Sequence, residues 1–135
     1  MTGIGGLIEN LGIAELPTEK RGVYWLDPGS LNVRDLATQL NALKARFVTI
    51  TARQLPGSEG ICLEYHWDLD GQLLGFSFAT PANSIDSIYD LCEAVDWIER
   101  EIHEGFAVDF LGREYEPLLL RVGDIPGLNL REVAK

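Results

Sequence analysis

Residues 61–80 read ICLEYHWDLDGQLLGFSFAT, and they carry the clearest structural pattern of the chain. The apolar side chains of its first half fall on one face of a strand, because successive side chains of a strand point to opposite sides: Ile61, Leu63, Tyr65 and Trp67. The pair Asp70-Gly71 follows, and both residues tolerate the positive φ of a tight turn. Residues Leu73–Thr80 then read as a returning strand. The stretch therefore predicts a β-hairpin.

A further strand precedes the hairpin. Residues Phe47–Gln54 are rich in β-branched side chains, and a breaker segment at Pro56–Gly60 separates them from the hairpin. The middle of the chain therefore predicts an antiparallel meander. Upstream, Val23–Leu26 reads as a short strand that the turn residues Asp27–Ser30 end.

Two helices flank the meander in sequence. The first covers Val33–Lys44, whose apolar residues repeat every three or four positions, with Ser30 or Asn32 as its N-cap. The second covers about Glu93–Glu104, and Gly105 follows where a left-handed C-terminal cap is usual. The apolar stripe of this second helix consists of Leu91, Val95, Ile98, Ile102 and Phe106.

These elements predict an α+β fold. We expect a two-layer sandwich whose mainly antiparallel mixed sheet, built from the central meander and edge strands near Val23 and Val108, carries two helices packed on one face. Residues 1–20 are expected to form an N-terminal arm or a marginal helix, because glycines interrupt their apolar pattern. Residues 21–114 form the α+β domain, and residues 115–135 form an irregular C-terminal tail.

The composition disfavours several classes of partner. The 135 residues carry a net charge of −10, which disfavours nucleic acid and anionic lipid, because both bind clustered Lys and Arg. Acidic residues outnumber basic ones most strongly after residue 84, so the negative charge there would attract a basic partner. No apolar run approaches the ~20 residues that cross a bilayer. Two cysteines, Cys62 and Cys92, are too few to ligate an iron–sulfur cluster. The N-terminus lacks the basic region of a signal peptide, and the cysteines form no CxxC pair, so we expect a cytoplasmic protein.

No convergent catalytic set is visible in the sequence. Glu64, His66 and Asp68 share one strand face, but about 7 Å separates alternate side chains, and a single histidine anchors a transition metal poorly. His103 could carry protons near neutral pH, although its acidic neighbours favour a solvated or interface charge. We therefore expect no catalytic, cofactor-binding or metal-binding residues.

The charged run Glu99-Arg100-Glu101 permits two interpretations. Glu101 lies beside the apolar stripe, where a buried carboxylate needs a partner. Within the chain this partner would be Arg113 or Arg121. Alternatively the run forms salt bridges with another subunit, because the planar guanidinium of Arg100 suits bidentate contacts with carboxylates.

Trp97 lies on the same helix, off its apolar stripe. Aromatic side chains are common anchors of protein interfaces. Packing over the meander is equally consistent with its position, so both interpretations stay open.

The segment DWIERE at residues 96–101, followed by FAVDFLG at residues 106–112, resembles a known signature. The C subunit of NADH-quinone oxidoreductase, respiratory complex I, carries D-W-x-E-R-E and then F-G-[IV]-x-F-x-G. The order of elements over roughly residues 20–114 also resembles that family. The chain departs from the pattern at Ala107, where the family has glycine, and at residues 112–114, which read GRE in place of G-H-P.

Two further segments narrow the resemblance. VTITA at residues 48–52 and LEYHWDLDG at residues 63–71 look more like the short homologous subunits of membrane-bound energy-converting nickel–iron hydrogenases, of the Ech or carbon-monoxide-induced type. In those complexes the small protein holds no cofactor and packs beside the large catalytic subunit and the iron–sulfur subunit.

The resemblance implies a non-catalytic scaffold subunit of a membrane-associated electron-transfer complex, located on the cytoplasmic side and peripheral to the inner membrane. The alternatives are the C subunit of an NADH-quinone oxidoreductase and a stand-alone binding or regulatory module, whose pocket would be lined by Tyr65, Trp67 and Phe78. The residues expected at the subunit interface are Trp97, Glu99, Arg100, Glu101 and Glu104, with Phe106 and Phe110 anchoring the helix to the sheet.

Overall fold

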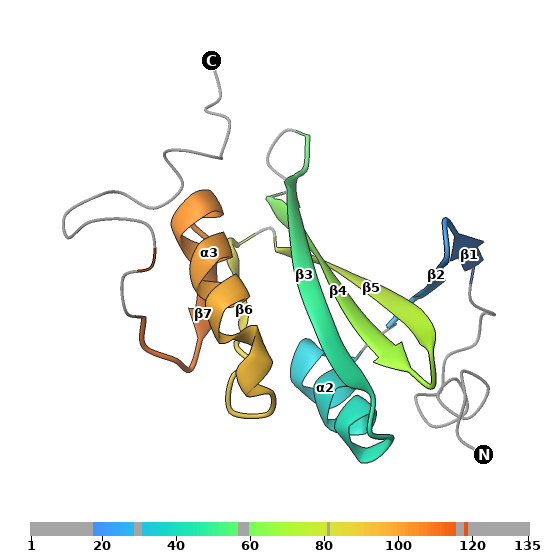
Figure 1. The fold of residues 1–135 in the computed structure, drawn as a ribbon. Helices are drawn as coiled ribbons and strands as arrows, with labels where there is room; N and C mark the ends of the chain where they lie inside the picture. The colour runs from blue at the N-terminus through green and yellow to red at the C-terminus, as the bar shows by residue number, and fades with distance from the viewer. Residues whose placement is uncertain (1–17, 29–30, 57–59, 81, 116–117, 119–135) are drawn as a thin grey trace.

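The computed structural model describes residues 18–28, 31–56, 60–80, 82–115 and 118 (Figure 1). In chain order its elements are β1 (Thr18–Lys20), β2 (Val23–Leu26), α2 (Val33–Ala42), β3 (Arg46–Gln54), β4 (Ile61–Leu69), β5 (Gln72–Thr80), β6 (Ser84–Asp86), the 3₁₀ helix η1 (Glu93–Val95), α3 (Asp96–Phe106) and β7 (Asp109–Leu111). The predicted order of strand, helix, meander and helix is confirmed within these residues.

Within the described residues, β1 to β5 form one mixed sheet in the order β1-β2-β5-β4-β3. The predicted meander is confirmed, because β3 pairs antiparallel with β4 and β4 pairs antiparallel with β5. Asp70 and Gly71 form the hairpin turn with φ of 53° and 83°, the left-handed values that such a two-residue turn requires. β2 pairs parallel with β5, and β1 extends the sheet beyond β2.

Both α2 and α3 lie on the same side of the sheet, so the predicted two-layer α+β sandwich is confirmed (Figure 1). On β4, the side chains that face the helices are buried, with Tyr65 0% and Trp67 1% exposed. Their cross-strand neighbours on β5 are Phe76 and Leu74, which are also buried. The alternating pattern of the meander thus places its apolar side chains in one core.

The helix α2 begins at one of the two predicted caps. Asn32 is the cap, because its side-chain Oδ1 accepts a hydrogen bond from the Asp35 N–H at 2.8 Å. Ser30 lies outside the described residues. The helix ends at Ala42, slightly before the predicted Lys44, because Lys44 has a left-handed φ of 61°, which does not continue a right-handed helix.

The second helix extends past its predicted C-terminal end. One 3₁₀ turn, η1, leads into α3, which continues to Phe106. The predicted cap at Gly105 is wrong, because Gly105 is helical and Ala107 has the left-handed backbone, with φ 59° and ψ 32°. The Ala107 N–H donates to the His103 carbonyl at 3.0 Å, which satisfies a carbonyl group at the helix end.

The edge strand predicted near Val108 does not join the main sheet. Strand β7 pairs instead with β6 in a separate parallel two-stranded sheet, with Ser84 opposite Asp109 and Asp86 opposite Leu111. Parallel strands require a long crossover connection, and the chain through η1 and α3 provides it. The segments β6, α3 and β7 therefore form one local unit beside the main sheet.

The predicted N-terminal arm (1–20) and C-terminal tail (115–135) fall largely outside the described residues. Of the arm, Thr18–Lys20 is described and forms the strand β1. Of the tail, Tyr115 and Leu118 are described, and both contact side chains of α3.

Candidate functional site

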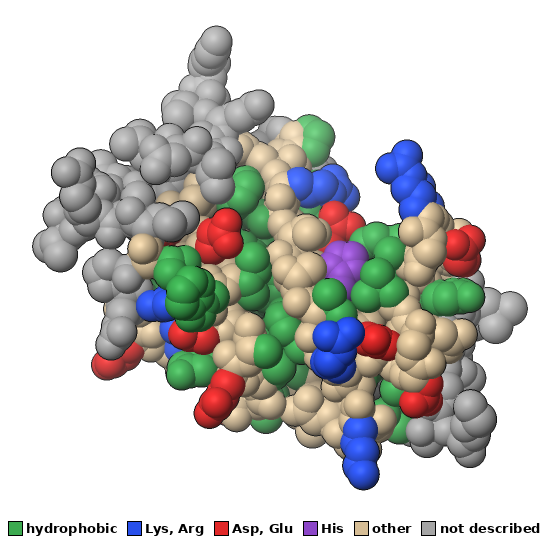
Figure 2. All heavy atoms as spheres, viewed as in Figure 1, with side chains coloured by type: hydrophobic (Ala, Val, Ile, Leu, Met, Phe, Trp, Pro, Cys, Tyr) green, Lys and Arg blue, Asp and Glu red, His purple; other side chains and the backbone are tan. Residues whose placement is uncertain are grey.

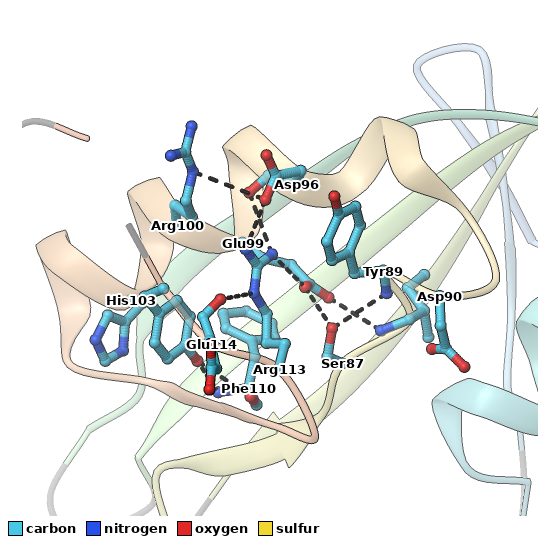
Figure 3. A network of polar contacts seen from close by, with 12 residues as sticks. Ser87, Tyr89, Asp90, Asp96, Glu99, Arg100, His103, Phe110, Arg113 and Glu114 are labelled. Carbon is cyan, nitrogen blue, oxygen red and sulfur yellow. Dashed lines mark hydrogen bonds and ion pairs between the residues drawn. The ribbon is translucent and has the colours of Figure 1, made fainter. Parts of the chain in front are cut away.

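The carboxylate of Glu99, in the first turn of α3, is the centre of a buried polar network (Figure 3). Its side chain is 0% exposed. One carboxylate oxygen accepts a hydrogen bond from the Ser87 hydroxyl at 2.6 Å, and the other accepts one from the Ile88 N–H at 3.1 Å. Arg113 Nη1 donates to the first oxygen at 3.2 Å. The network ties α3 to the segment after β6 and to the segment after β7.

The guanidinium of Arg113 has partners on several sides. Its Nη2 forms an ion pair with Asp96 Oδ1, and its central carbon lies 4.8 Å from the ring centroid of Tyr89 and 5.1 Å from that of Tyr115. Only 5% of the side chain is exposed. Burial lowers the pKa of Arg113, but the hydrogen bonds to Asp96 and Glu99 outweigh it and raise the pKa above its ordinary value. Arg113 therefore stays charged and balances Glu99.

Burial also perturbs the acids of this network. Burial raises the pKa of Glu99, and the hydrogen bonds from Ser87, Ile88 and Arg113 only partly oppose the shift. The nearby hydroxyl of Tyr65 is buried and has no hydrogen-bond partner among the described residues. Burial, followed by the negative charge of Glu99, raises the pKa of Tyr65 well above its ordinary value. The hydroxyl of Tyr65 therefore stays protonated beside the network.

The prediction that Glu101 is the carboxylate beside the core is wrong. Glu101 is exposed, and Glu99 takes the buried position, because Glu99 follows Val95 by one helical turn and precedes Ile102 by nearly one. Of the two arginines considered as internal partner, Arg113 does pair with the buried acid. The spacing of Val95, Glu99 and Ile102 is the signal that could have identified this acid, and Ser87 carries no comparable signal in the sequence.

The C-terminal end of α3 is held by a second set of contacts. The His103 ring stacks on Tyr115, with centroids 3.8 Å apart and planes 3° from parallel. His103 Nδ1 contacts the Val108 carbonyl oxygen at 2.9 Å. The Phe110 N–H donates to the Tyr115 hydroxyl, and burial raises the pKa of Tyr115 to about 12. The half-buried His103 therefore helps to fix the turn into β7.

The outer side of α3 presents an aromatic side chain. Trp97 is 69% exposed, so it does not pack over the meander. The guanidinium carbon of Arg100 lies 5.7 Å from the Trp97 ring centroid, and Arg100 Nε lies 3.7 Å from Asp96 Oδ1. Arg100 is itself only 11% exposed at its side chain. A tryptophan held on a rigid helix and open to solvent is suited to contact another molecule.

The residues expected at an interface thus divide into two groups. Trp97 and Glu101 are exposed. Glu99 is fully buried, and Glu104 is 7% exposed and accepts a hydrogen bond from the Leu118 N–H at 2.7 Å. Phe110 is fully buried. The carboxylates of Glu99 and Glu104 therefore make contacts inside the chain. Trp97, Glu101 and the small exposed part of the Arg100 side chain can contact another molecule.

A polar pocket of about 260 Å³ opens beside this surface. It lies between the start of α3 and the segment after β7, where Figure 3 shows several of its side chains. Its lining consists of Tyr89, Asp96, Arg100, Arg113, Glu114 and Tyr115.

The strand face that carries Glu64, His66 and Asp68 is arranged differently from a metal site. Glu64 Oε1 lies 3.5 Å from Arg53 Nε, and Asp68 Oδ2 lies 3.2 Å from Arg46 Nη2. In Figure 2 the surface over β3 to β5 accordingly mixes acidic, basic and apolar side chains around one histidine. The described part of the chain contains no group of three His, Cys, Asp or Glu side chains placed to hold a metal ion.

His66 and Trp25 pack against each other on this face. Their ring centroids are 5.4 Å apart at 72°, and burial lowers the pKa of His66. The Trp25 ring lies directly over Gly75, where an added Cβ would stand 2.6 Å from ring carbons. Glycine is therefore required at position 75 for Trp25 to cover this part of the sheet.

The apolar pocket expected between Tyr65, Trp67 and Phe78 is not open, because these side chains pack against one another. Tyr65 and Trp67 are buried and stack with centroids 5.9 Å apart, and Tyr65 meets Phe78 edge-on at 5.6 Å. These described side chains fill the core between the sheet and the helices.

In the described residues, no helix is long and apolar enough to span a bilayer.

Comparison with solved structures shows the same fold in other proteins, including the following two. A chain of the membrane-bound sulfane sulfur reductase, an archaeal respiratory membrane complex, superposes with a TM-score of 0.74 at 19% identity, covering 92% of this chain and 77% of that chain. The trypsin-resistant fragment (1–134) of Nqo5 superposes with a TM-score of 0.65 at 16% identity, covering 84% of this chain and 98% of that chain.

The family is shown by sequence. No curated protein matches the chain. A family model described as the respiratory-chain NADH dehydrogenase 30 kDa subunit matches residues 30–134, most of the chain and all of α3 with its network. The resemblance of the DWIERE segment to complex I is thereby confirmed: the chain belongs to the family of the respiratory-chain NADH dehydrogenase 30 kDa subunit.

Proposed function

We propose that this chain is a non-catalytic scaffold subunit of a membrane-associated electron-transfer complex, of the energy-converting hydrogenase type related to complex I. The observation that carries the proposal is the exposed Trp97 on α3, inside the segment that resembles the family signature. The chain would stabilise the large catalytic subunit and the iron–sulfur subunit from the cytoplasmic side, peripheral to the membrane.

The network below α3 supports a scaffold role. Glu99 and Arg113 fix one face of the helix by charge-assisted hydrogen bonds, so Trp97 projects from a rigid support. A preorganised anchor loses little conformational entropy when a partner binds. Aromatic and arginine side chains carry much of the binding energy at protein interfaces. Trp97 with the adjacent Arg100 has this composition.

Purification of the tagged chain from membranes of its source tests the proposal. Mass spectrometry of the eluate and hydrogen-dependent viologen reduction are the two measurements. We expect a nickel–iron large subunit and an iron–sulfur subunit to accompany the chain, with hydrogen-dependent dye reduction. The Trp97→Ala variant should lose most of this co-purification, because it removes the exposed ring. Val48→Ala, which shortens an exposed apolar side chain on the sheet, should keep it.

Other outcomes discriminate the alternatives. The family description favours the C subunit of an NADH-quinone oxidoreductase as the second candidate, and quinone-reductase subunits without hydrogenase activity in the eluate would select it. Reduction of sulfane sulfur by the eluate would select a complex of the kind to which the archaeal structural neighbour belongs. A solitary chain in the eluate would contradict the scaffold role and favour a stand-alone module.

A further inference from the structure

The pocket beside α3 presents negative charge to solvent, although arginines line it. Arg113 and Arg100 are 5% and 11% exposed at their side chains, whereas Asp96 is 26% exposed. Glu114 is an exposed residue at the pocket rim. An approaching group therefore meets the two carboxylates before it meets either guanidinium.

The positive charges of the pocket are already engaged inside the chain. Arg113 donates to Asp96 and Glu99 and lies over two tyrosine rings. Arg100 lies near the Asp96 carboxylate and over the ring of Trp97. An external anion would have to compete with these contacts. In contrast, Asp96 uses Oδ1 in both of its ion pairs with these described arginines, which leaves Oδ2 as an acceptor.

Aromatic rings in and beside the pocket also favour a positively charged ligand. Tyr89 lines the pocket and is 38% exposed, and Trp97 on the adjoining turn is 69% exposed. The faces of aromatic rings attract cations, arginine most often. The excess of acidic residues in the C-terminal part of the chain adds a long-range attraction for a basic partner.

We infer that this pocket receives a basic side chain, an arginine or a lysine, of the neighbouring subunit, with Asp96 and Glu114 as acceptors and Tyr89 as the aromatic wall. The inference rests on the proposed scaffold function and names the chemistry of the partner at that site. Arginine fits best, because its planar fork can reach two carboxylates and stack on a ring at once.

Small probes test the pocket without the partner. Amide NMR of the isotope-labelled chain would be followed during titration with N-acetyl-arginine amide, with the citrulline analogue as an uncharged match of the same shape. We expect saturable shifts around Tyr89, Asp96 and Glu114 with the arginine probe and none with citrulline. N-acetyl-glutamate amide is the anionic probe. Shifts with glutamate at these amides, equal shifts with citrulline, or no shifts at all would overturn the inference.

Matched variants assign the binding to the pocket. Glu114→Gln should weaken binding of the arginine probe roughly two- to fivefold, the effect of losing one partly exposed ion pair. Glu19→Gln carries the same charge change on β1, which Figure 1 places far from α3, and should leave binding unchanged. Circular dichroism checks that both variants fold. Equal weakening by both variants would show a general charge effect and contradict the inference.

A charge reversal separates this inference from the proposed function. In the membrane purification, Glu114→Lys should reduce the co-purifying subunits, because it would place a cation against the partner's basic side chain, while Glu19→Lys should not. If Trp97→Ala loses the partner subunits and Glu114→Lys keeps them, the scaffold function stands and the pocket inference fails. If the chain is solitary but binds the arginine probe, the pocket is a cation site and the scaffold function fails.

Discussion

The two helices α2 and α3 pack on the same side of the sheet but bury different chemistry. The buried residues of α2 are all apolar: Val33, Leu36, Ala37 and Leu40. In α3 the buried residues include two carboxylates, Glu99 and Glu104, beside Ile102 and Gly105. One helix therefore serves the core alone, and the other holds polar contacts to the segments around it.

This difference indicates different roles for the two helices. Burying ions costs desolvation energy, so an apolar replacement often stabilises a protein as well or better. The ionic contacts of α3 are then best explained by the orientation they impose on the helix and on β6 and β7. The corresponding contact of α2 is a surface pair, Arg34 with Asp90, whose side chains are 38% and 65% exposed. Of these two sets of contacts, the α3 network is the one buried enough to fix a geometry.

The largest expected effect breaks the α3 network. Arg113→Ala should lower the free energy of unfolding by about 3–5 kcal/mol, because it leaves the buried Glu99 charge without its partner. Arg34→Ala is the comparison variant on α2 and should cost clearly less, because its ion pair with Asp90 is exposed and its other contact is a single hydrogen bond to the Ser87 carbonyl at 2.8 Å. Urea unfolding measures both. Similar costs for the two variants would contradict the contrast between the helices.

The apolar face of α2 gives the next effect. Leu36 is 0% exposed, and Leu36→Ala should cost about 2–5 kcal/mol through lost burial and the cavity left behind. Gln39→Ala, on the exposed face of the same helix, should stay within about 0.5 kcal/mol of the original chain. If thermal or urea unfolding shows little loss for Leu36→Ala, α2 does not contribute to the core as its burial indicates.

The buried carboxylate of α3 should give a pH signature of its own, because its pKa is raised, whereas the Arg34 contact of α2 lowers the pKa of Asp90. Glu99→Gln should cost about 1–3 kcal/mol, because it weakens the hydrogen bonds to Ser87 and Arg113. Burial raises the pKa of Glu99 above its ordinary value of 4.5. The folded chain therefore gains stability from the protonated carboxyl group below pH 4.5, and it loses this stability as pH rises through the folded-state pKa. The cost of Glu99→Gln should therefore shrink from acidic to neutral pH in urea unfolding. A cost that grows with pH would mean that the pKa of Glu99 is lowered.

The smallest effect concerns the end of α3. Ala107 has a left-handed φ of 59°, which strains an alanine and suits glycine. Ala107→Gly should therefore stabilise the chain by about 0.5–1 kcal/mol. Ala42→Gly, in the last turn of α2, should destabilise it by up to about 1 kcal/mol. Thermal unfolding of the two variants measures both effects. A loss of stability in both would show that Ala107 makes side-chain contacts that outweigh the strain.

Local patterns were sufficient for much of the fold. The alternation in Ile61–Leu69, the Asp70-Gly71 turn and the period of Val33–Ala42 each depend on neighbours within a few residues. The cap at Asn32 belongs to the same class, since its partner Asp35 lies on the next turn. The meander, the first helix and the two-layer arrangement were therefore predictable.

The candidate site was only partly predictable for the opposite reason. The charged segment and the position of Trp97 off the apolar stripe follow from helical spacing, and Arg113 could be named as a partner for a buried acid. The partners of the buried acid depend on how α3 packs, and Ser87 contributes a hydroxyl to Glu99 through a hydrogen bond across the fold. Such contacts leave no periodic signal in the chain.

Short-range spacing in the chain encodes β2, the three strands of the meander, the first helix and the family signature, whereas β1 and β6 were not predicted from it. The packing of the whole chain decides that Ser87 meets Glu99, that β7 pairs with β6 apart from the main sheet, and that Ala107 takes the left-handed position. The physical reason is common to all three. Each is set by how the crossover through α3 packs against the sheet, and that packing minimises the free energy of the whole chain rather than of any one segment.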